Sequence, residues 1–544
     1  AENLEKSNVP ERWKNRILDY LTNSGKNHID RLYMLGPNQD IGDIASLPLS
    51  AFLTVLDPGQ KWALQKLKKQ GPYLIKGSAG TGKSLVGLYY IFNKIKEDEE
   101  NPNKRYAVIT YTNTLVKANK DILFNLLPSH LQDRVDCLSL DSIAEQLTAK
   151  ARSKHSQIPP PKALTLRDIA RYLNDYIVPK VGHNSEEVKL INRLGIDYVV
   201  EEIEYLIIGN GIKDVKDYHA LQRRGRSSKL DTKSRNRIWT LYTEFEKKCK
   251  EHNVQTFEKW RLIARDYLRN HPDEEKYDAI FVDEAQDFSK VGRQLCLELV
   301  YNPKHLVLAA DSGQSIYNFP ARWIDCDKRF NFEKRRPILL SKAYRTTREI
   351  SDAIYSLRAE YGDADDRSDQ ASAVFSGPPP RRINAPLQDH PKHVIGIIKD
   401  LILPKDTNRQ PTNPGHIAII VRHFDQTKTY QTYLQQAGID CAIISKETPL
   451  QVDARHVHIV TAHSSKGLGF PITIVPMVSS LYYPLYDLIQ KATTAEQLEE
   501  IRVKEQRLFY VALSRASHQL TIIVDEDRQS EFVSRFSQNS WLTN

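Results

Sequence analysis

The sequence predicts an α/β protein with two parallel-sheet domains and an inserted helical subdomain. Three observations predict this class: short apolar runs alternate with helical patterns, the runs form two groups, and a long helical stretch interrupts the first group. A parallel strand that helices cover on both faces is apolar along its whole length. The runs of this kind are YLIK (73–76), YAVIT (106–110), AIFVDE (279–284), HLVLAA (305–310), HIAIIV (416–421), VHIVTA (457–462) and ITIVPM (472–477).

The spacing of these runs sets the expected domain organisation. One group spans about 73–310 and the other about 416–524. Between strands of the first group, LRDIARYLNDYIV (166–178) and IWTLYTEFEKKC (238–249) show helical spacing of apolar residues. We expect an N-terminal extension, a first sheet domain in two parts, a helical insertion and a second sheet domain. Their expected ranges are 1–50, 51–145 with 271–338, 146–270 and 339–544.

A basic run, LQRRGRSSKLDTKSRNR (221–237), lies within the expected helical insertion. It is rich in arginine and in turn-forming residues. Two interpretations are open: a solvated surface loop, or a loop that contacts nucleic-acid phosphates.

The composition favours a soluble cytoplasmic protein that can contact a polyanion. The 544 residues carry a net charge of +9, and 40% are hydrophobic. The five cysteines lie far apart and form no CxxC pair, which argues against a disulfide framework and against a zinc site. No apolar run approaches the roughly 20 residues that span a bilayer. The N-terminal stretch AENLEKSNVPERW has no apolar signal region.

The motif GSAGTGKS (77–84) follows a predicted strand and opens a predicted helix. Glycines let backbone amides approach phosphate oxygens closely, and a helix N-terminus adds partial positive charge. Lys83 supplies a charge for the outer phosphates and Ser84 a hydroxyl for Mg²⁺. A glycine-rich turn is the alternative. The expected nucleotide-binding residues here are Gly77, Ser78, Ala79, Gly80, Thr81, Gly82, Lys83 and Ser84.

A second motif, VDEAQD (282–287), ends another buried strand. This position places Asp283 beside the phosphate loop, where it can hold Mg²⁺, and allows Glu284 to polarise an attacking water. The alternative is an acidic helix N-terminus, where such residues are also favoured. Two adjacent acids in a chain with a phosphate loop favour the first interpretation.

The stretch LFYVALSRASHQL (508–520) has the apolar spacing of a buried helix. Leu508, Val511 and Ala512 share one stripe, on which the next residue is Arg515. An arginine near a helix C-terminus can interact with the helix dipole or extend to water. The other interpretation is that a buried anion faces Arg515.

Six motifs occur in the order seen in the UvrD/Rep/PcrA-like superfamily 1A DNA helicases, which the chain resembles from residue 60 to 516. They are the phosphate loop, DEAQD, ADSGQSIY (310–317), AYRTT (343–347), VTAHSSKGLGFP (460–471) and EQRLFYVALSRA (505–516). The resemblance implies two RecA-like P-loop domains with a helical insertion, and Mg-ATP as the ligand between them.

The resemblance also implies roles around the nucleotide. Gln60 is expected to read adenine, and Tyr344 to stack on it. Gln314 is expected to sense the γ-phosphate. Arg345 and Arg515 are expected to reach that phosphate from the second sheet domain. The phosphate would then be the buried anion that faces Arg515. Gly467 is the last of the expected nucleotide-binding residues. The expected catalytic residues are Lys83, Glu284, Gln314, Arg345 and Arg515.

A track for single-stranded DNA is implied as well. Tyr111 and Phe319 match aromatic residues that stack on bases, a contact that accepts any sequence. Taken alone, both would be interpreted as core residues, and His463 as a satisfied polar residue. His456 and His458 are expected to be structural. The remaining expected DNA contacts are Thr112, Asn113, Ser139, Asp141 and His463.

Three departures from the family pattern stand out. Leu85 replaces an arginine that covers adenine, and Gly469 replaces a glutamate that touches the ribose, so looser nucleotide selectivity is expected. DCAIIS (440–445) is followed closely by VDARHVHIV (452–460). The large 2B subdomain that relatives insert here is therefore expected to be absent or vestigial.

We expect an ATP-dependent helicase or translocase that moves 3′ to 5′ on single-stranded DNA and unwinds tailed duplexes. The alternative is a nucleotide-gated or DNA-stimulated ATPase subunit of a bacterial defence or toxin-linked complex that needs a partner. An RNA-directed helicase is a further alternative. The lead-in DIASLPLSAFLTVLDPGQ (43–60) resembles that of such defence-linked ATPases, which suggests a protein partner or a missing N-terminal module.

Overall fold

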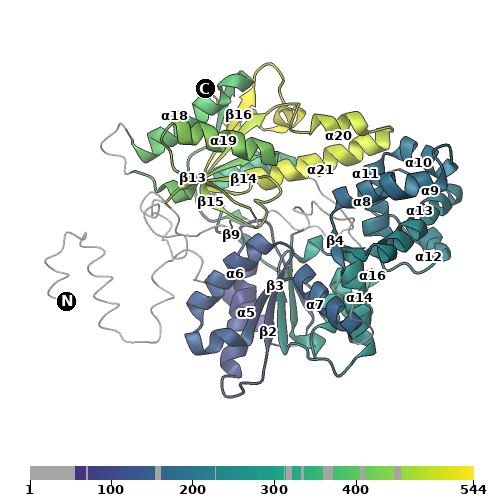
Figure 1. Ribbon diagram of the computed structural model, residues 1–544. Helices are drawn as coiled ribbons and strands as arrows, with labels where there is room; N and C mark the ends of the chain where they lie inside the picture. The colour runs from purple at the N-terminus through teal and green to yellow at the C-terminus, as the bar shows by residue number, and fades with distance from the viewer. Residues whose placement is uncertain are drawn as a thin grey trace.

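The structure is a computed structural model of the 544-residue chain. The residues that it describes are 56–68, 71–153, 161–226, 228–311, 313, 322–332, 336–358, 372–404, 411–445 and 455–543. The expected N-terminal extension (1–50) lies outside them. Figure 1 shows two sheet-containing lobes, one above the other, with a helical region beside both. None of the described helices combines the length and apolar character that a membrane crossing needs.

Among the described residues, six parallel strands form the sheet of the N-terminal lobe, in the order β3-β2-β6-β7-β1-β8. The predicted strands at 73–76 and 106–110 match β1 and β2. The apolar-run criterion does not find β3, because only the two end residues of this edge strand are buried. The strands are β1 (Tyr73–Lys76), β2 (Tyr106–Thr110), β3 (Val135–Ser139), β6 (Ala279–Val282), β7 (Leu306–Ala310) and β8 (Ile338–Leu339).

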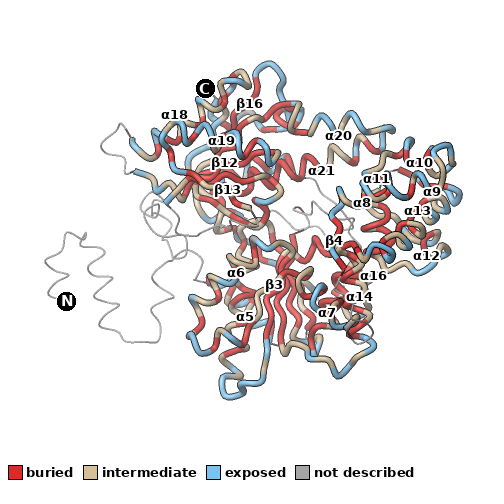
Figure 2. Tube along the Cα trace, viewed as in Figure 1, coloured by how far each residue is buried: buried red, intermediate tan, exposed pale blue. Residues whose placement is uncertain are grey.

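Helices cover both faces of this sheet, as continuous apolar strands require. One face packs on α4, α5 and α6, and the other on α7, α14 and α15. Successive strand residues point to opposite faces, so Ile75 and Leu74 belong to different cores. Figure 2 shows the central strands β2, β6 and β7 buried along their length. The helices are α4 (Pro58–Lys66), α5 (Lys83–Glu97), α6 (Asn113–Leu126), α7 (Leu140–Ser153), α14 (Phe257–Asn270) and α15 (Lys290–Glu298).

The helical region, residues 166–270, has its own apolar core. The predicted helices at 166–178 and 238–249 lie within it: the first forms α8, a π-helical turn and the start of α9, and the second lies in α13. A short parallel pair, β4 (Lys162–Leu164) with β5 (Val254–Thr256), closes its base. The further helices are α8 (Leu166–Tyr172), α9 (Val178–Val181), α10 (Glu186–Leu194), α11 (Ile196–Glu201), α12 (Val215–Ala220) and α13 (Thr232–Glu251), with π-helical segments at Leu173–Ile177 and Glu202–Ile208.

The basic run 221–237 is neither a wholly solvated nor a simple phosphate-contacting loop. Arg223 donates to the buried Glu202 carboxylate, and the Arg226 side chain is only 1% exposed. Arg235 donates to three backbone carbonyls of the neighbouring turn, and from Thr232 the chain is helical. Carboxylates of the neighbouring helix and backbone carbonyls therefore hold these arginines inward.

The sheet of the C-terminal lobe has seven described strands, all parallel, in the order β13-β14-β12-β15-β16-β11-β17. One face packs on α17 and α21, and the other on α18 and α19. The α/β class is thus confirmed for both lobes. The strands are β11 (Arg381–Ala385), β12 (Ile417–Val421), β13 (Cys441–Ile443), β14 (Val457–Thr461), β15 (Phe470–Val478), β16 (Ala516–Asp525) and β17 (Leu542–Thr543).

The remaining elements of this lobe are α17 (Arg348–Ile354), α18 (His390–Ile402), α19 (Phe424–Gln436), α20 (Tyr486–Lys491) and α21 (Ala495–Leu513), with a small parallel pair β9 (Lys342–Ala343) and β10 (Ser372–Ala373). Only residues 444–456 separate β13 from β14, two strands that are neighbours in the sheet. In this chain the connection between them is short.

The expectation of one helix over 508–520 is wrong in its second half. Helix α21 ends at Leu513, and β16 begins at Ala516 between β15 and β11. The β-branched run TIIV within β16 favours a strand that is paired on both sides over a continued helix. Arg515 therefore lies in the tight turn between helix and strand, and not on a helical face.

Candidate nucleotide site between the lobes

The site lies where strands of the N-terminal lobe end. Because all paired strands are parallel, the residues that follow β1, β2, β3, β6 and β7 meet at one edge of the sheet. Lys83, Tyr111 and Asp283 follow strands at this edge, and Ser139 is the last residue of β3. Ligands of open α/β sheets bind at the carboxyl edge of the strands.

The phosphate loop connects β1 to α5 as the motif predicts. Gly80 and Gly82 have φ of 76° and 81°, which side chains disfavour. A Cβ on Gly82 would come within 2.2 Å of Gln60 Nε2, so the loop is also packed too closely for a side chain. Lys83 Nζ donates to the carbonyl oxygens of Gly77 and Ser78, at 2.8 and 3.0 Å. Its ammonium thus lies inside the loop, where the outer phosphates would bind.

Two carboxylates and a hydroxyl face the loop from β6 and α5. The Ser84 hydroxyl bonds to the Asp283 carboxylate, and Asn119 donates to that carboxylate at 3.4 Å. Burial, together with the adjacent Glu284, raises the pKa of Asp283 to about 6. Such a hydroxyl–carboxylate pair beside a phosphate loop fits a hydrated Mg²⁺.

Glu284 has a φ of 53°, in the left-handed region, and lies at the turn between β6 and the short 3-10 segment Ala285–Asp287. Burial acts to raise the pKa of Glu284, but the nearby Lys466, Lys83 and Arg515 outweigh it and lower this pKa. Glu284 also accepts a hydrogen bond from Gln286. An ionised, positioned carboxylate is what a residue that polarises water requires.

Two guanidiniums from the C-terminal lobe lie opposite these acids. Arg345 Nη1 and Arg515 Nη1 both donate to the carbonyl oxygen of Leu468, at 3.3 and 2.9 Å. Arg515 is 1% exposed, and its Nε donates to the Val511 carbonyl at the end of α21. Burial and the neighbouring Arg345 lower the pKa of Arg515 to about 10, and burial lowers that of Arg345. Both sites therefore favour an added anion.

Gly469, where the resemblance implied a glutamate, makes room for Arg345. A Cβ at this position would come within 2.9 Å of Arg345 Cδ and 3.0 Å of its Nε. Arg345 also passes close to Gly80, and the Tyr344 amide donates to the Gly80 carbonyl at 2.9 Å. A side chain at position 469 would therefore crowd Arg345 where it approaches the phosphate loop.

The expected adenine contacts lie together as well. Gln60 is buried, donates to the Thr81 carbonyl at 3.0 Å and accepts from the Asp57 amide at 3.1 Å. Burial and a hydrogen bond to Asp57 raise the pKa of the Tyr344 hydroxyl. Asp57, which caps α4, was not singled out by the sequence, although an N-cap aspartate before Pro-Gly-Gln is a local signal.

A buried ion pair joins the lobes next to this site. Lys466 Nζ lies 2.7 Å from Asp287 Oδ1, and the side chains are 2% and 1% exposed. Burial raises the pKa of Asp287 to about 6, although Lys466 opposes this. Sequence reasoning missed both residues. They belong to the motifs SSKGLGF and DEAQD, so motif membership was the available signal.

The expected DNA contacts are placed less uniformly. Tyr111 packs 5.7 Å from the Phe288 ring and 5.5 Å from the Arg261 guanidinium. Asp141 forms a 2.8 Å ion pair with Arg261, so this carboxylate has a structural partner. Ser139 bonds to Ser142, and Asn113 is exposed at the start of α6, next to its N-cap Thr112.

His463 follows β14, and burial, with the nearby Arg422, lowers its pKa to about 3. It is therefore a neutral residue at neutral pH. His458 is buried inside β14 and packs on Phe470, in line with a structural role. Gly467 has φ of 81° and lies against Leu115. Gln314 and Phe319 lie outside the described residues.

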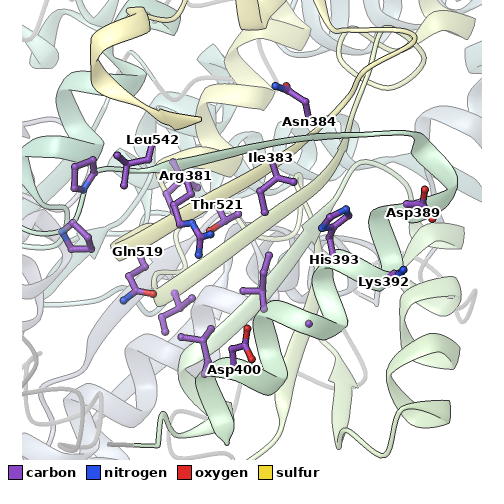
Figure 3. A pocket seen from close by; sticks show the side chains of 17 residues that line it. Arg381, Ile383, Asn384, Asp389, Lys392, His393, Asp400, Gln519, Thr521 and Leu542 are labelled. Carbon is purple, nitrogen blue, oxygen red and sulfur yellow. The ribbon is translucent and has the colours of Figure 1, made fainter. Parts of the chain in front are cut away.

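A separate groove lies on the C-terminal lobe, between α18 and the sheet (Figure 3). It encloses about 890 Å³, with Arg381, Lys392 and Asp400 among its polar residues and Ile383 and Leu542 among its apolar ones. None of the predicted site residues is among its described lining residues.

The two facing lobes, with a phosphate loop on one and Arg345 and the buried Arg515 on the other, define a P-loop nucleotide-binding protein. Comparison with known proteins agrees. Residues 56–326 match the family model described as UvrD/REP helicase N-terminal domain, and residues 444–527 match the UvrD-like helicase C-terminal domain. The chain belongs to the UvrD-like superfamily 1A helicase family.

Similar curated proteins are DNA helicases. The ATP-dependent DNA helicase PcrA of Leuconostoc citreum is 23% identical over 293 residues, which cover 52% of this chain and 36% of that protein. PcrA of Staphylococcus aureus Mu50 is 23% identical over 315 residues, covering 56% and 40%. A probable DNA helicase II homolog of Rickettsia felis is 24% identical over 412 residues, covering 72% and 57%. The chain thus spans between 36% and 57% of the length of these relatives.

A solved C-terminal domain of a possible DNA helicase from Lactobacillus plantarum is 21% identical, with a TM-score of 0.26, and covers 37% of this chain and 99% of that one. At this score it bears on neither the fold nor the function.

Proposed function

We propose that this protein is an ATP-dependent motor that hydrolyses Mg-ATP between its lobes, moves 3′ to 5′ on single-stranded DNA and unwinds tailed duplexes. The observation that carries the proposal is the position of Arg345 and Arg515. These arginines come from the C-terminal lobe, yet they lie beside Glu284 and the phosphate loop of the N-terminal lobe. Hydrolysis then requires both lobes together, and lobe closure becomes the power stroke.

Each residue of the site has a task in this scheme. The loop amides and Lys83 hold the outer phosphates, and the Ser84–Asp283 pair would hold a metal ion through its oxygens. Bound Mg²⁺ supplies positive charge at the phosphates. Glu284, ionised, orients and polarises the attacking water. Arg345 and Arg515 neutralise charge that develops on the γ-phosphate, a contribution of about 10³ to 10⁵ in rate for such arginines.

DNA contacts are proposed at the same edge of the sheet. Tyr111 offers a ring at the end of β2, and Arg261 and Phe288 hold that ring in place. Ser139, Asn113 and Thr112 lie at neighbouring strand and helix ends. Stacking contributes about 1–3 kcal/mol per base without regard to sequence, which suits a translocating motor. With the nucleotide site on the same edge, lobe movement can displace the strand.

The test is strand displacement on duplexes with a 3′ tail, a 5′ tail or no tail, with ATP turnover measured in parallel. We expect turnover to depend on single-stranded DNA, and displacement only from the 3′-tailed duplex. The variant Lys83→Ala is the control that removes the phosphate-loop charge. Turnover without displacement would contradict the unwinding part of the proposal, and displacement from the 5′ tail would contradict the polarity.

A further inference from the structure

Helix α21 connects two distant places in the molecule. Its C-terminal end leads directly into Arg515, whose Nε donates to the Val511 carbonyl of the last helical turn at 2.9 Å. Its N-terminal end extends beyond the sheet to the helical region, as Figure 1 shows for α20 and α21 beside α10 and α11. Nineteen residues of α-helix form a rigid rod of about 28 Å.

The N-terminal end of α21 is attached to the helical region by charged and polar contacts. Arg226 Nη1 lies 2.8 Å from Glu500 Oε1 and 3.1 Å from Glu201 Oε2. The Arg226 and Glu500 side chains are 1% and 4% exposed. Lys504 pairs with Glu201 at 2.8 Å, which extends the network along the helix.

Further polar contacts surround this ion pair. Gln497 Nε2 donates to the Leu194 carbonyl at 2.9 Å, and Thr493 donates to the Arg193 carbonyl. Lys491 and Asp197 form an exposed ion pair at 3.3 Å. The apolar core of the helical region contains no described residue of α20 or α21. Interfaces held by polar contacts separate more readily than apolar ones.

The helical region is inserted in the N-terminal lobe and packs on it through α14, which contacts α7 and α15. Contacts that hold α21 on the helical region therefore hold the C-terminal lobe, with Arg515, against the phosphate loop. The Arg226 guanidinium is strongly oriented, since Glu202 also lies 3.5 Å from it. A buried pair of this kind is specific in geometry, because an unpaired partner would be costly.

We propose that the Arg226–Glu500 contact is a closure latch: it forms when the lobes close, breaks when they open, and through α21 positions Arg515 at the nucleotide. Glu500 and Arg226 are thus positioning residues and do not touch the nucleotide. This inference rests on the proposed function, since the reaction that it positions is ATP hydrolysis.

The test compares Glu500→Lys with Glu499→Lys. The first places a third positive charge beside Arg226 and Lys504, whereas the second makes the same change at an exposed neighbour on the same helix. Single-turnover hydrolysis of ATP with single-stranded DNA should fall about tenfold or more in Glu500→Lys, a size typical of coupling between distant sites. The Kd for ATP should change little, because Gln60 and the phosphate loop lie in the other lobe. Glu499→Lys should behave like the wild type.

A cross-link distinguishes positioning from general damage. Asp197→Cys with Lys491→Cys, joined by a short bis-maleimide, ties the same interface covalently outside the buried pair. Added to Glu500→Lys, this cross-link should restore single-turnover hydrolysis, and the untreated protein should remain slow. Treated wild type is the control for the native cysteines, of which Cys137 is the least buried. If Glu500→Lys does not fold, Glu500→Gln is compared with and without the cross-link.

Wild-type rates in Glu500→Lys, or a loss that the cross-link fails to restore, would overturn the latch while the proposed function stands. If the wild-type protein did not hydrolyse ATP, the proposed function would be refuted. The latch would then also have no reaction to position.

Discussion

Arg345 and Arg515 share one carbonyl acceptor, that of Leu468, in a site where burial disfavours positive charge. Such an arrangement is unfavourable on its own, since like charges repel and both are desolvated. It becomes favourable when an anion lies between them and the phosphate loop. At the residue scale, the protein therefore holds positive charge in place before its ligand arrives, which is the preorganisation that catalysis of phosphoryl transfer requires.

Gly80→Ala tests how closely Arg345 approaches the phosphate loop. A Cβ at this position would lie 2.5 Å from Arg345 Cβ, on a backbone with φ of 76°. We expect ATP turnover to fall severalfold, with a loss of about 1 kcal/mol in stability from the φ strain. The matched control is Gly438→Ala, at φ of 73° with nothing within 4 Å, which should lose the same stability and keep its turnover. Equal turnover in both variants would contradict the predicted crowding.

Lys466→Met tests the buried ion pair between the lobes. The change leaves the Asp287 carboxylate buried without its lysine, which typically costs about 3–5 kcal/mol. The double variant Lys466→Met with Asp287→Leu should recover much of this loss, because the Asp287 carboxylate is then no longer buried without its lysine. Urea denaturation measures the free energy of unfolding of the single and of the double variant. Lys491→Met, which removes an exposed ion pair, should change the midpoint little. If the double variant were as unstable as the single variant, the unpaired Asp287 carboxylate would not be the cause of the lost stability.

The positions of the residues in the candidate nucleotide site were predictable because motifs fix them locally. Glycines, Lys83 and Ser84 lie within eight residues of sequence, and a strand end places Asp283. The partners of Asp141 and Arg226 were not predictable in this way. Their contacts, Arg261 and Glu500, are 120 and 274 residues away in the sequence. Only the folded chain shows that these charges are satisfied within the protein.

The β-strands show the same contrast at the element scale. Fully buried central strands such as β2 and β12 have almost entirely apolar sequences, and the sequence predicts their positions closely. Strands β3 and β11 do not: the edge strand β3 (VDCLS) is buried only at its two end residues, and β11 (RRINA) is exposed at Arg381 and Asn384. The end of α21 was mispredicted because pairing of β16 with both neighbours outweighs the helical periodicity of its first residues.

Strand β14 should make stability depend on pH through His458. Burial lowers the pKa of this histidine to about 4, from an ordinary value of about 6.5. On acidification His458 takes up a proton in the unfolded chain at a higher pH than in the folded protein. The free energy of unfolding therefore falls between about pH 6.5 and 4, and below pH 4 His458 causes no further change. The full effect is about 3 kcal/mol. Thermal melts of His458→Leu across this range should show a flatter pH dependence than the wild type. A parallel dependence in both would contradict this assignment.

At the scale of the whole molecule, the two lobes and the helical region form a closed arrangement around one site. Lys466 and Asp287 join the lobes near the nucleotide, and Arg226 and Glu500 join them through the helical region. Two lobes with a helical insertion were expected from the sequence. Their contacts were not, because surfaces that meet only in the folded protein carry no periodic signal.

DNA-dependent turnover should weaken steeply with salt. The chain carries a net charge of +9, and contacts with phosphates release counterions, so affinity falls as a power of the salt concentration. ATP turnover is measured at increasing concentrations of single-stranded DNA, in about 50 to 200 mM salt. We expect the DNA concentration for half-maximal stimulation to rise by tenfold or more over this range, with about the same maximal rate. A constant half-maximal concentration would indicate that phosphate contacts contribute little.

The most direct measurement is single-turnover ATP hydrolysis by Arg515→Ala, with the Kd for ATP determined on the same sample. In the proposed site the N-terminal lobe holds most of the nucleotide, so the Kd should change by only a few-fold. The hydrolysis rate should fall by about 10³ or more. Hydrolysis at the wild-type rate would contradict the claim that the two lobes complete one catalytic site.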